Sequence, residues 1–348
     1  MTATQPTPPA DPPSEDRDAG LTVEAYLDEW MAVQATQIQP STWENYRMAI
    51  RNYVVPHIGA VPLAALTIRD LNSLYAQLHA CGGREDQPLK AHTVRRTHNI
   101  LHKAFGDAVV VGTMATNPSH RATLPRVDRG TGDPDQERVV WDAAQLRAFL
   151  DHTVDHRFHD VWFVAAFTGM RRGEVLGLRW GDVDLDLPEP LLRVRRSLSV
   201  VAGHASLTSP KGHRPRALHL DPPTVAVIRR QRDRQAEHQR DRGPAWRNRW
   251  DLVFTDRNGR YLAPDTVSQD FRRTVLAAPV PTKRLHDLRH LHATLLLQAG
   301  VPVKVVSERL GHATTQMTME IYAHVLPAMD ADAIARFSAH VFGNQPPS

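Results

Sequence analysis

Residues 286–290 read His-Asp-Leu-Arg-His, and the chain continues through Glu308-Arg-Leu-Gly-His312 to Tyr322. Upstream lie Thr168-Gly-Met-Arg171-Arg-Gly-Glu174 and, within Thr-Ser-Pro-Lys-Gly, Lys211. Guanidinium groups bind the non-bridging oxygens of a phosphodiester bidentately, and a lysine or histidine can protonate a leaving alcohol. A tyrosine can hold the phosphoryl group covalently between two half-reactions. These residue types together are the set needed to attack a phosphodiester without a metal ion.

The composition indicates a two-domain protein with a basic body. The chain has 348 residues, of which 41% are hydrophobic and 23% charged, as in ordinary globular proteins. The formal net charge is +4, although residues 1–20 hold four acids and one arginine. The remaining residues therefore carry +7, which suits a polyanionic partner. The single Cys81 excludes an internal disulfide framework and predicts a reducing, cytoplasmic location, and no apolar run is long enough to span a membrane.

The first third of the chain predicts a disordered tail followed by a bundle of four helices. Residues 1–20 are rich in Pro, Asp, Thr and Ser and are expected to be disordered. Helical spacing of apolar residues begins at Leu21, and Ser41-x-x-Glu44 has the pattern of a capping box opening a helix to about Tyr53. Further helices are expected from Thr67, where Thr67-x-x-Asp70 opens the helix, and from about Thr93 to Val111. The outer face of the latter is expected to carry Arg95, Arg96, His98, His102 and Lys103. We therefore expect a helical domain over residues 21–125.

A linker and a second, mixed domain are expected after this bundle. Residues 126–137 collect Gly, Pro and Asp without periodicity, which is typical of a linker. Asp142-x-x-Gln145 predicts the first helix of a domain covering 138–348. An apolar helix should occupy 157–168, and strands are expected over 191–201 and 216–220 with a turn at 202–213. After Val253-Phe254 the pattern is helical to the end, and Gly311, directly after Leu310, is the expected stop of one of these helices.

Each candidate site residue, taken alone, also has an ordinary structural interpretation. Arg171 and Glu174 are three residues apart, so they could form a surface ion pair. Lys211 could be an exposed lysine and Tyr322 a core aromatic residue. His286 and His290 have the spacing of a zinc pair, but 19 histidines produce about one such pair by chance, and no metal site is predicted.

Taken together and in this order, the motifs closely resemble the tyrosine recombinase (phage integrase) family over residues 137–328. The region 21–120, with Tyr26-Leu-Asp-Glu-Trp30 near its start and Asn117-Pro118 near its end, is similar to that family's core DNA-binding domain. The resemblance implies a mainly α fold with a small β-sheet. It consists of an N-terminal helical core-binding (SAM-like) domain and an α+β catalytic domain with a C-terminal helix.

The resemblance also implies roles for individual residues. Arg171 and Arg289 would hold the scissile phosphate, and Lys211 would protonate the departing 5′-oxygen. His286 would assist proton transfer, His312 would bind a phosphate oxygen, and Tyr322 would become a 3′-phosphotyrosine. Glu174 and His290 would have supporting roles. The bond energy stays in the phosphotyrosine ester, so no cofactor, metal or ATP is expected.

The expected activity is site-specific recombination or integration of double-stranded DNA by a tetramer, with possible accessory DNA-bending proteins and no membrane partner. Only about 20 residues precede the core-binding region, which argues against an arm-site architecture and leaves open a simpler recombinase or a mobile-element integrase with few accessory sites. Three alternatives stay open: a type IB topoisomerase, a DNA-binding relative without catalysis, and a metallohydrolase built on His286 and His290. The DNA target, the bias between integration and excision, and the host element are not encoded in any motif.

Overall fold

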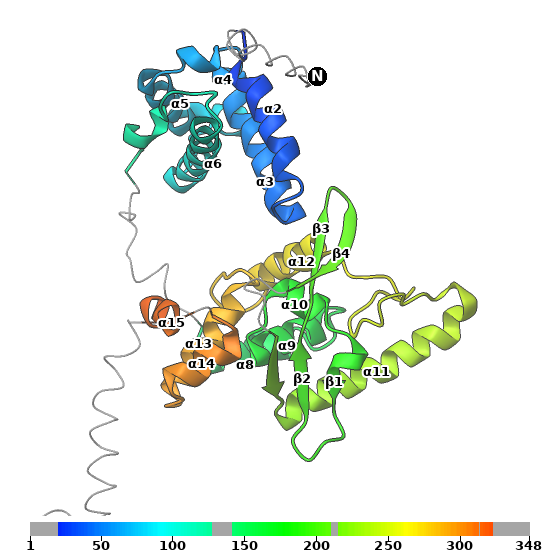
Figure 1. Ribbon diagram of the computed structural model, residues 1–348. Coiled ribbons are helices and arrows are strands. Elements are labelled where there is room, and N and C mark those ends of the chain that lie inside the picture. Colours follow the sequence, from blue (N-terminus) through cyan, green and yellow to red (C-terminus); the bar gives the residue numbers. More distant parts are fainter. Residues whose placement is uncertain (1–19, 127–140, 210–214, 313, 323–348) are drawn as a thin grey trace, which may run out of the picture. The chain divides into compact units, whose positions relative to one another are not determined.

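The computed structural model describes residues 20–126, 141–209, 215–312 and 314–322 (Figure 1). Its contacts divide the chain into two compact units, Met1–Glu137 and Arg138–Ser348. The expected tail at 1–20 and the expected linker at 126–137 lie, apart from residues 20 and 126, outside the described residues. Mostly helical secondary structure with two small sheets agrees with the predicted fold class.

The first unit is a helical bundle around one apolar core. Tyr75, Leu101 and Phe105 are almost completely buried at its centre. The cap of one helix matches the sequence, because the Thr67 hydroxyl accepts from the Asp70 amide while the Asp70 carboxylate accepts from the Thr67 amide. The elements are α2 (Val23–Gln34), α3 (Pro40–Ala49), a π-helical turn (Ile50–Val54), α4 (Val55–Ile58), α5 (Ile68–Cys81) and α6 (Ala91–Val110), with short 3₁₀ turns at Leu63–Ala65, Arg84–Asp86 and Pro118–Arg121.

The capping box predicted at Ser41 is wrong. The helix begins at Pro40, with Gln39 as its N-cap and no side-chain cap hydrogen bond. Proline favours this earlier start because its φ is already helical and its missing N–H costs nothing in the first turn. Glu44 instead pairs with Arg47 at 2.6 Å. The helical path also continues past Tyr53, through the π-helical turn, to Ile58.

The expectation that His98 and His102 lie on an outer face is also wrong. Both are half-buried, with His98 Nδ1 3.2 Å from the Tyr75 hydroxyl and His102 Nδ1 2.9 Å from the Ser119 hydroxyl. Polar partners from α5 and from the 3₁₀ turn at Pro118–Arg121 allow these rings to turn inward. Arg95 and Arg96 on the same helix are exposed, as expected.

The second unit begins at α8 (Ala143–His152), whose predicted Asp142–Gln145 capping box is present. The apolar helix predicted at 157–168 is α9 (His159–Thr168), which ends at Gly169 in the left-handed conformation (φ 64°). The next helix is α10 (Arg172–Leu176), with Arg171 as its N-cap. Trp162, Phe149 and Phe271 are fully buried in the main core of this unit.

Two small antiparallel sheets follow. The first contains β1 (Val183–Asp184), β2 (Leu191–Val194) and β5 (Arg216–His219) in the order β1–β2–β5, and the second pairs β3 (Ser197–Val201) with β4 (His204–Thr208). The sequence predicted one strand over 191–201 and a turn over 202–213. The structure instead breaks the strand at 195–196, and Ala202-Gly203, both with positive φ, form a tight turn that leads into β4. Figure 1 shows this hairpin projecting beside α10 and α12.

Helices dominate the remainder. They are α11 (Pro222–Arg242), a 3₁₀ turn (Gly243–Ala245), α12 (Pro264–Ala277), α13 (Asp287–Gln298), α14 (Val303–Leu310) and α15 (Thr315–Tyr322). α14 ends at Gly311 (φ 67°), the predicted helix stop. Among the described residues, no helix is both long and apolar enough to cross a bilayer.

Candidate active site

The site is built where two helices end. α9 ends at Gly169 and α14 at Gly311, so the last carbonyl groups of both helices lack partners within their own helix. Arg289, from the first turn of α13, donates to the Gly169 carbonyl at 2.8 Å and to the Leu310 carbonyl at 2.7 Å. The partial negative charge at these helix ends favours a guanidinium there. Arg289 is 4% exposed, so its position is tightly fixed.

Arg171 approaches the same helix end from α10. Its Nη1 donates to Glu174 Oε1 at 3.0 Å, and its Nη2 lies 3.5 Å from the Gly311 carbonyl oxygen. The predicted pairing of Arg171 with Glu174 is therefore confirmed. Glu174 is fully buried, so this is an internal ion pair, whereas an exposed surface pair would contribute little.

His312 and His286 lie near these arginines. His312 directly follows α14, and burial, followed by the charges of Arg289 and Arg171, lowers the pKa of His312 to about 4. Burial, followed by the charges of His290 and Arg289, likewise lowers the pKa of His286 to about 4, although His286 retains an exposed surface. Both rings are therefore neutral at pH 7.

The hydrogen bond of His312 defines what the ring can offer a ligand. Its Nδ1 lies 2.7 Å from the hydroxyl of Thr318, a buried residue of α15. When Nδ1 of the neutral ring accepts the Thr318 proton, Nε2 carries the ring proton and can donate to an anion. Thr318 also stands four residues before Tyr322 on the same helix.

The other sequence candidates are placed less completely. His290 is half-buried, its ring centroid is 5.3 Å from that of His286, and burial lowers its pKa. Tyr322 is the last residue of α15, and its side chain lies outside the described part of the structure. Lys211 also lies outside the described residues. Within the described ranges, no group of three or more His, Cys, Asp or Glu residues has the arrangement of a metal site.

Several residues of the site were missed by sequence reasoning. Arg216, on β5, donates to both oxygens of Glu174 and to the Arg309 carbonyl. Arg309 itself donates to His292 Nε2 at 3.0 Å and to the Phe167 carbonyl at 3.3 Å. Each of these contacts joins segments far apart in the sequence, so no local pattern predicts it. The abundance of arginines was the only feature of the sequence that hinted at such residues.

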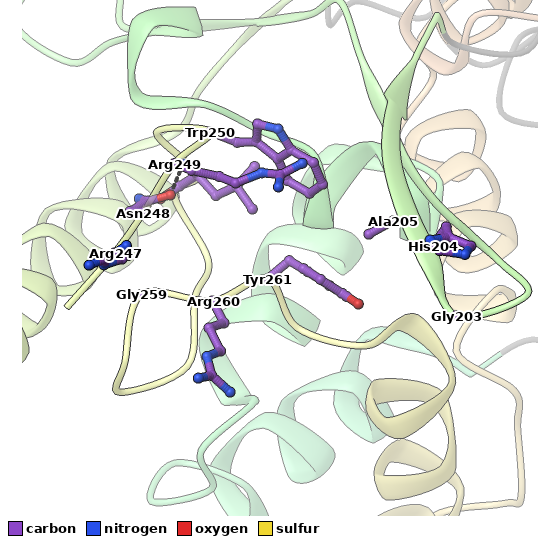
Figure 2. A pocket seen from close by; sticks show the side chains of 11 residues that line it. Gly203, His204, Ala205, Arg247, Asn248, Arg249, Trp250, Gly259, Arg260 and Tyr261 are labelled. Carbon is purple, nitrogen blue, oxygen red and sulfur yellow. Dashed lines mark hydrogen bonds between the residues drawn. The ribbon is translucent and has the colours of Figure 1, made fainter. Parts of the chain in front are cut away.

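A separate hollow lies between the β3–β4 hairpin and the loop after α11 (Figure 2). It has a volume of about 370 Å³ and is lined by Arg247, Arg249 and Arg260 together with Trp250 and Tyr261. The Arg249 guanidinium lies 4.2 Å from the Trp250 ring centroid. None of the sequence-predicted site residues lines this hollow, so it is distinct from the arginine cluster at the helix ends.

Comparisons with known proteins identify the family. The model of the phage integrase family matches residues 142–329, and that of the phage integrase N-terminal SAM-like domain matches residues 22–79. A tyrosine recombinase XerC-like protein of Caldanaerobacter subterraneus subsp. tengcongensis is 26% identical over 319 residues, covering 85% of this chain and 77% of the relative.

Solved structures show the same fold. The Tn1549 transposon integrase in complex with transposon right end DNA has a TM-score of 0.71 at 20% identity, covering 92% of this chain and 99% of the other. A lambda integrase tetramer bound to a Holliday junction has a TM-score of 0.62 at 18% identity, covering 89% and 80%. Because the family match spans more than half of the chain, this protein belongs to the phage integrase family and is a tyrosine recombinase, an enzyme that breaks and rejoins DNA.

Proposed function

We propose that this recombinase cleaves double-stranded DNA at specific sites by forming a 3′-phosphotyrosine at Tyr322. The observation that carries the proposal is the convergence of Arg171 and Arg289 on the carbonyl ends of α9 and α14, beside His312. Two guanidinium groups, which contact main-chain carbonyls, and the His312 ring, which contacts the Thr318 hydroxyl, form a preorganised site for one phosphate. Such preorganised donors stabilise the charge that develops on the non-bridging oxygens during transfer.

Proton transfer is assigned to the remaining residues. Lys211 would donate a proton to the departing 5′-oxygen, and neutral His286 would assist proton transfer near the nucleophile. Glu174 would orient Arg171, and His290 would support the first turn of α13. Because side chains supply the cations and the ester retains the bond energy, we propose that neither metal nor ATP takes part.

The first unit is proposed to bind the core DNA site. Arg95 and Arg96 lie exposed on α6, where they could contact phosphates. We propose domains at 21–125 and 138–348 joined by a linker at 126–137, with residues 1–20 as a tail. By analogy with the lambda integrase tetramer on a Holliday junction, we propose that this protein acts as a tetramer. We further propose that it acts in the cytoplasm for a mobile element, with accessory DNA-bending proteins as partners.

The test is covalent capture on DNA. The core site is first identified from repeats in the DNA flanking the gene, and a nicked suicide duplex carrying it is incubated with the full chain in EDTA without ATP. The wild type is expected to form a covalent adduct. Tyr322→Phe is expected to form none while its DNA affinity stays near that of the wild type, because the substitution removes a nucleophile and no phosphate-binding charge.

Two outcomes contradict the proposal. An adduct that survives in Tyr322→Phe would exclude Tyr322 as the nucleophile, and adduct formation that requires added divalent metal would exclude a metal-independent mechanism. Relaxation of a plasmid lacking the core site, at a rate equal to that of one carrying it, would favour the type IB topoisomerase alternative.

A further inference from the structure

Arg216 occupies a central position that the family roles above leave unexplained. It lies on β5, and its side chain is only 9% exposed. Its Nη2 donates to Glu174 Oε2 at 2.6 Å and its Nη1 to Glu174 Oε1 at 3.2 Å, while its Nε donates to the Arg309 carbonyl at 2.8 Å. One planar guanidinium therefore joins α10 to the end of α14.

Glu174 is shared between two arginines. Oε1 accepts from Arg171 Nη1 at 3.0 Å as well as from Arg216, and Oε2 accepts from the Arg171 amide at 3.0 Å as well as from Arg216. The bidentate contact with Arg216 fixes the plane of the carboxylate. That plane in turn sets the direction in which Glu174 holds the Arg171 guanidinium.

Arg216 also supports the turn that carries His312. A Cβ placed on Gly311 would lie 3.0 Å from Arg216 Nη1 and 3.2 Å from its Cδ, so the turn is in close contact with this side chain. The Gly311 carbonyl is the oxygen that Arg171 Nη2 approaches, and His312 is the next residue. Movement of Arg216 would therefore displace both sides of the proposed phosphate site.

We propose that Arg216 is a positioning residue for DNA cleavage, which holds Glu174 so that Arg171 points at the scissile phosphate and which fixes the turn presenting His312. This inference rests on the proposed function. Arg216 need not touch the DNA, because it acts through Glu174 and the end of α14. A loss of Arg216 should consequently slow the cleavage step and leave DNA affinity largely intact.

The protonation state of Glu174 makes the proposal testable through the pH dependence of cleavage. Burial raises the pKa of Glu174, but hydrogen bonds and charge from Arg216, with help from Arg171, outweigh burial and leave the pKa below its usual value. Among the described residues, the charged groups that face this carboxylate are Arg171, the N-cap of its own helix, and Arg216 from β5. Without Arg216, burial should dominate and Glu174 should take up a proton at higher pH.

The experiment measures single-turnover adduct formation between pH 6 and 9 on the suicide duplex. Arg216→Gln is expected to cleave on the order of 10–10² times more slowly than wild type, with DNA affinity changed by less than about threefold. Its rate should rise with pH, because Glu174 regains its charge as the proton leaves. The double variant Arg216→Gln/Glu174→Gln should be no slower than Glu174→Gln alone and should lack this rise.

Two further variants keep the test decisive. Arg216→Lys restores the charge without the planar pair of donors, so it should cleave slowly but without the rise with pH. Arg230→Gln is the matched control, because Arg230 also binds a buried carboxylate, that of Asp160. It should cleave at the wild-type rate.

The outcomes separate this inference from the proposed function. If the wild type forms no adduct, the proposed function itself fails. If the wild type forms an adduct and Arg216→Gln or Arg216→Lys cleaves equally fast, Arg216 has no positioning role. The proposal would also be overturned if Arg216→Gln cleaved slowly at every pH and if its loss of cleavage rate added fully to that of Glu174→Gln in the double variant. Should Arg216→Gln fail to fold, as judged by thermal unfolding, Arg216→Lys decides alone.

Discussion

Glu174 and Asp160 are both buried carboxylates bound by two arginines, yet the two regions are built differently. Around Glu174 the partners are themselves shielded, since the Arg216 side chain is 9% exposed and that of Arg171 26%. Around Asp160 the partners come from α11, and Arg230 and Arg234 are 51% and 35% exposed. An exposed guanidinium can return to water when its partner is lost, whereas a buried one cannot.

This difference in exposure corresponds to two roles: one group holds two helices together, and the other orients a side chain. The Asp160 group attaches α11 to α9 and tolerates movement of its arginines at the surface. The Glu174 group fixes the direction of Arg171 within the proposed phosphate site, where a displacement of about 1 Å can cost on the order of 10² in rate. The same pair of residue types therefore serves a structural role in one place and, we propose, positions the Arg171 guanidinium in the other.

Removing the two carboxylates should give the largest contrast. Glu174→Gln is expected to lower the unfolding free energy by about 3–5 kcal/mol, because it leaves Arg216 buried without its counter-charge. It should also slow cleavage by about 10²-fold or more. Asp160→Asn should cost only about 1 kcal/mol and leave the cleavage rate unchanged. Urea unfolding and single-turnover cleavage measure both, and equal losses for the two variants would remove the distinction.

Acid should lower the unfolding free energy of the second unit by protonating His292, a buried residue of α13. Burial, followed by the charge of Arg309, lowers the pKa of His292 to about 3, and the neutral ring accepts from Arg309 Nε. The unfolded chain binds this proton near pH 6.5 and the folded chain only near pH 3. The contribution of His292 to stability is therefore complete above pH 6.5 and is lost as the pH falls toward 3.

His292→Gln, whose amide oxygen can still accept from Arg309, should flatten this dependence. The measurement compares urea midpoints at pH 7 and pH 4.5, with His152→Gln, at an exposed site in α8, as the control. The control should keep the wild-type loss of stability on acidification. If His292→Gln loses as much stability between the two pH values as the wild type, His292 is not the group that takes up the proton.

The smallest effect is expected at a third carboxylate with two arginines. Asp270 pairs with Arg157 and Arg273, whose side chains are 63% and 73% exposed. Arg273→Ala should change the unfolding free energy by less than about 1 kcal/mol and leave cleavage unaffected, because Arg157 remains and water solvates the exposed ends. A loss as large as that from Glu174→Gln would show that exposure of the arginines does not decide the cost.

Local signals in the sequence predicted much of the fold. The Thr67–Asp70 and Asp142–Gln145 caps and the stops at Gly169 and Gly311 were found because each depends on residues close together in the chain. The cap at Ser41 failed because proline at the preceding position offers a competing helix start. Strand β4 was missed because the turn at Ala202-Gly203 lacks the residue pair most typical of hairpins.

The site was predicted less completely than the fold. The pairing of Arg171 with Glu174 follows from a spacing of three residues between the N-cap and the first turn of α10. The second partner of Glu174, Arg216, lies 42 residues away on a strand, and no pattern in the sequence distinguishes it from the other arginines. Similarly, Thr318 could be assigned to His312 only once the fold had brought α15 against the end of α14.

The docking of Arg289 on main-chain carbonyls has a consequence for how this protein can change over time. Its acceptors belong to Gly169 and Leu310, and a carbonyl oxygen is present whatever side chain a residue carries. Substitutions along α9 and α14 can therefore accumulate without removing either acceptor, provided that both helices still end in the same place. What inheritance must preserve here is the position at which two helices stop, and the two glycines with left-handed backbones mark those positions.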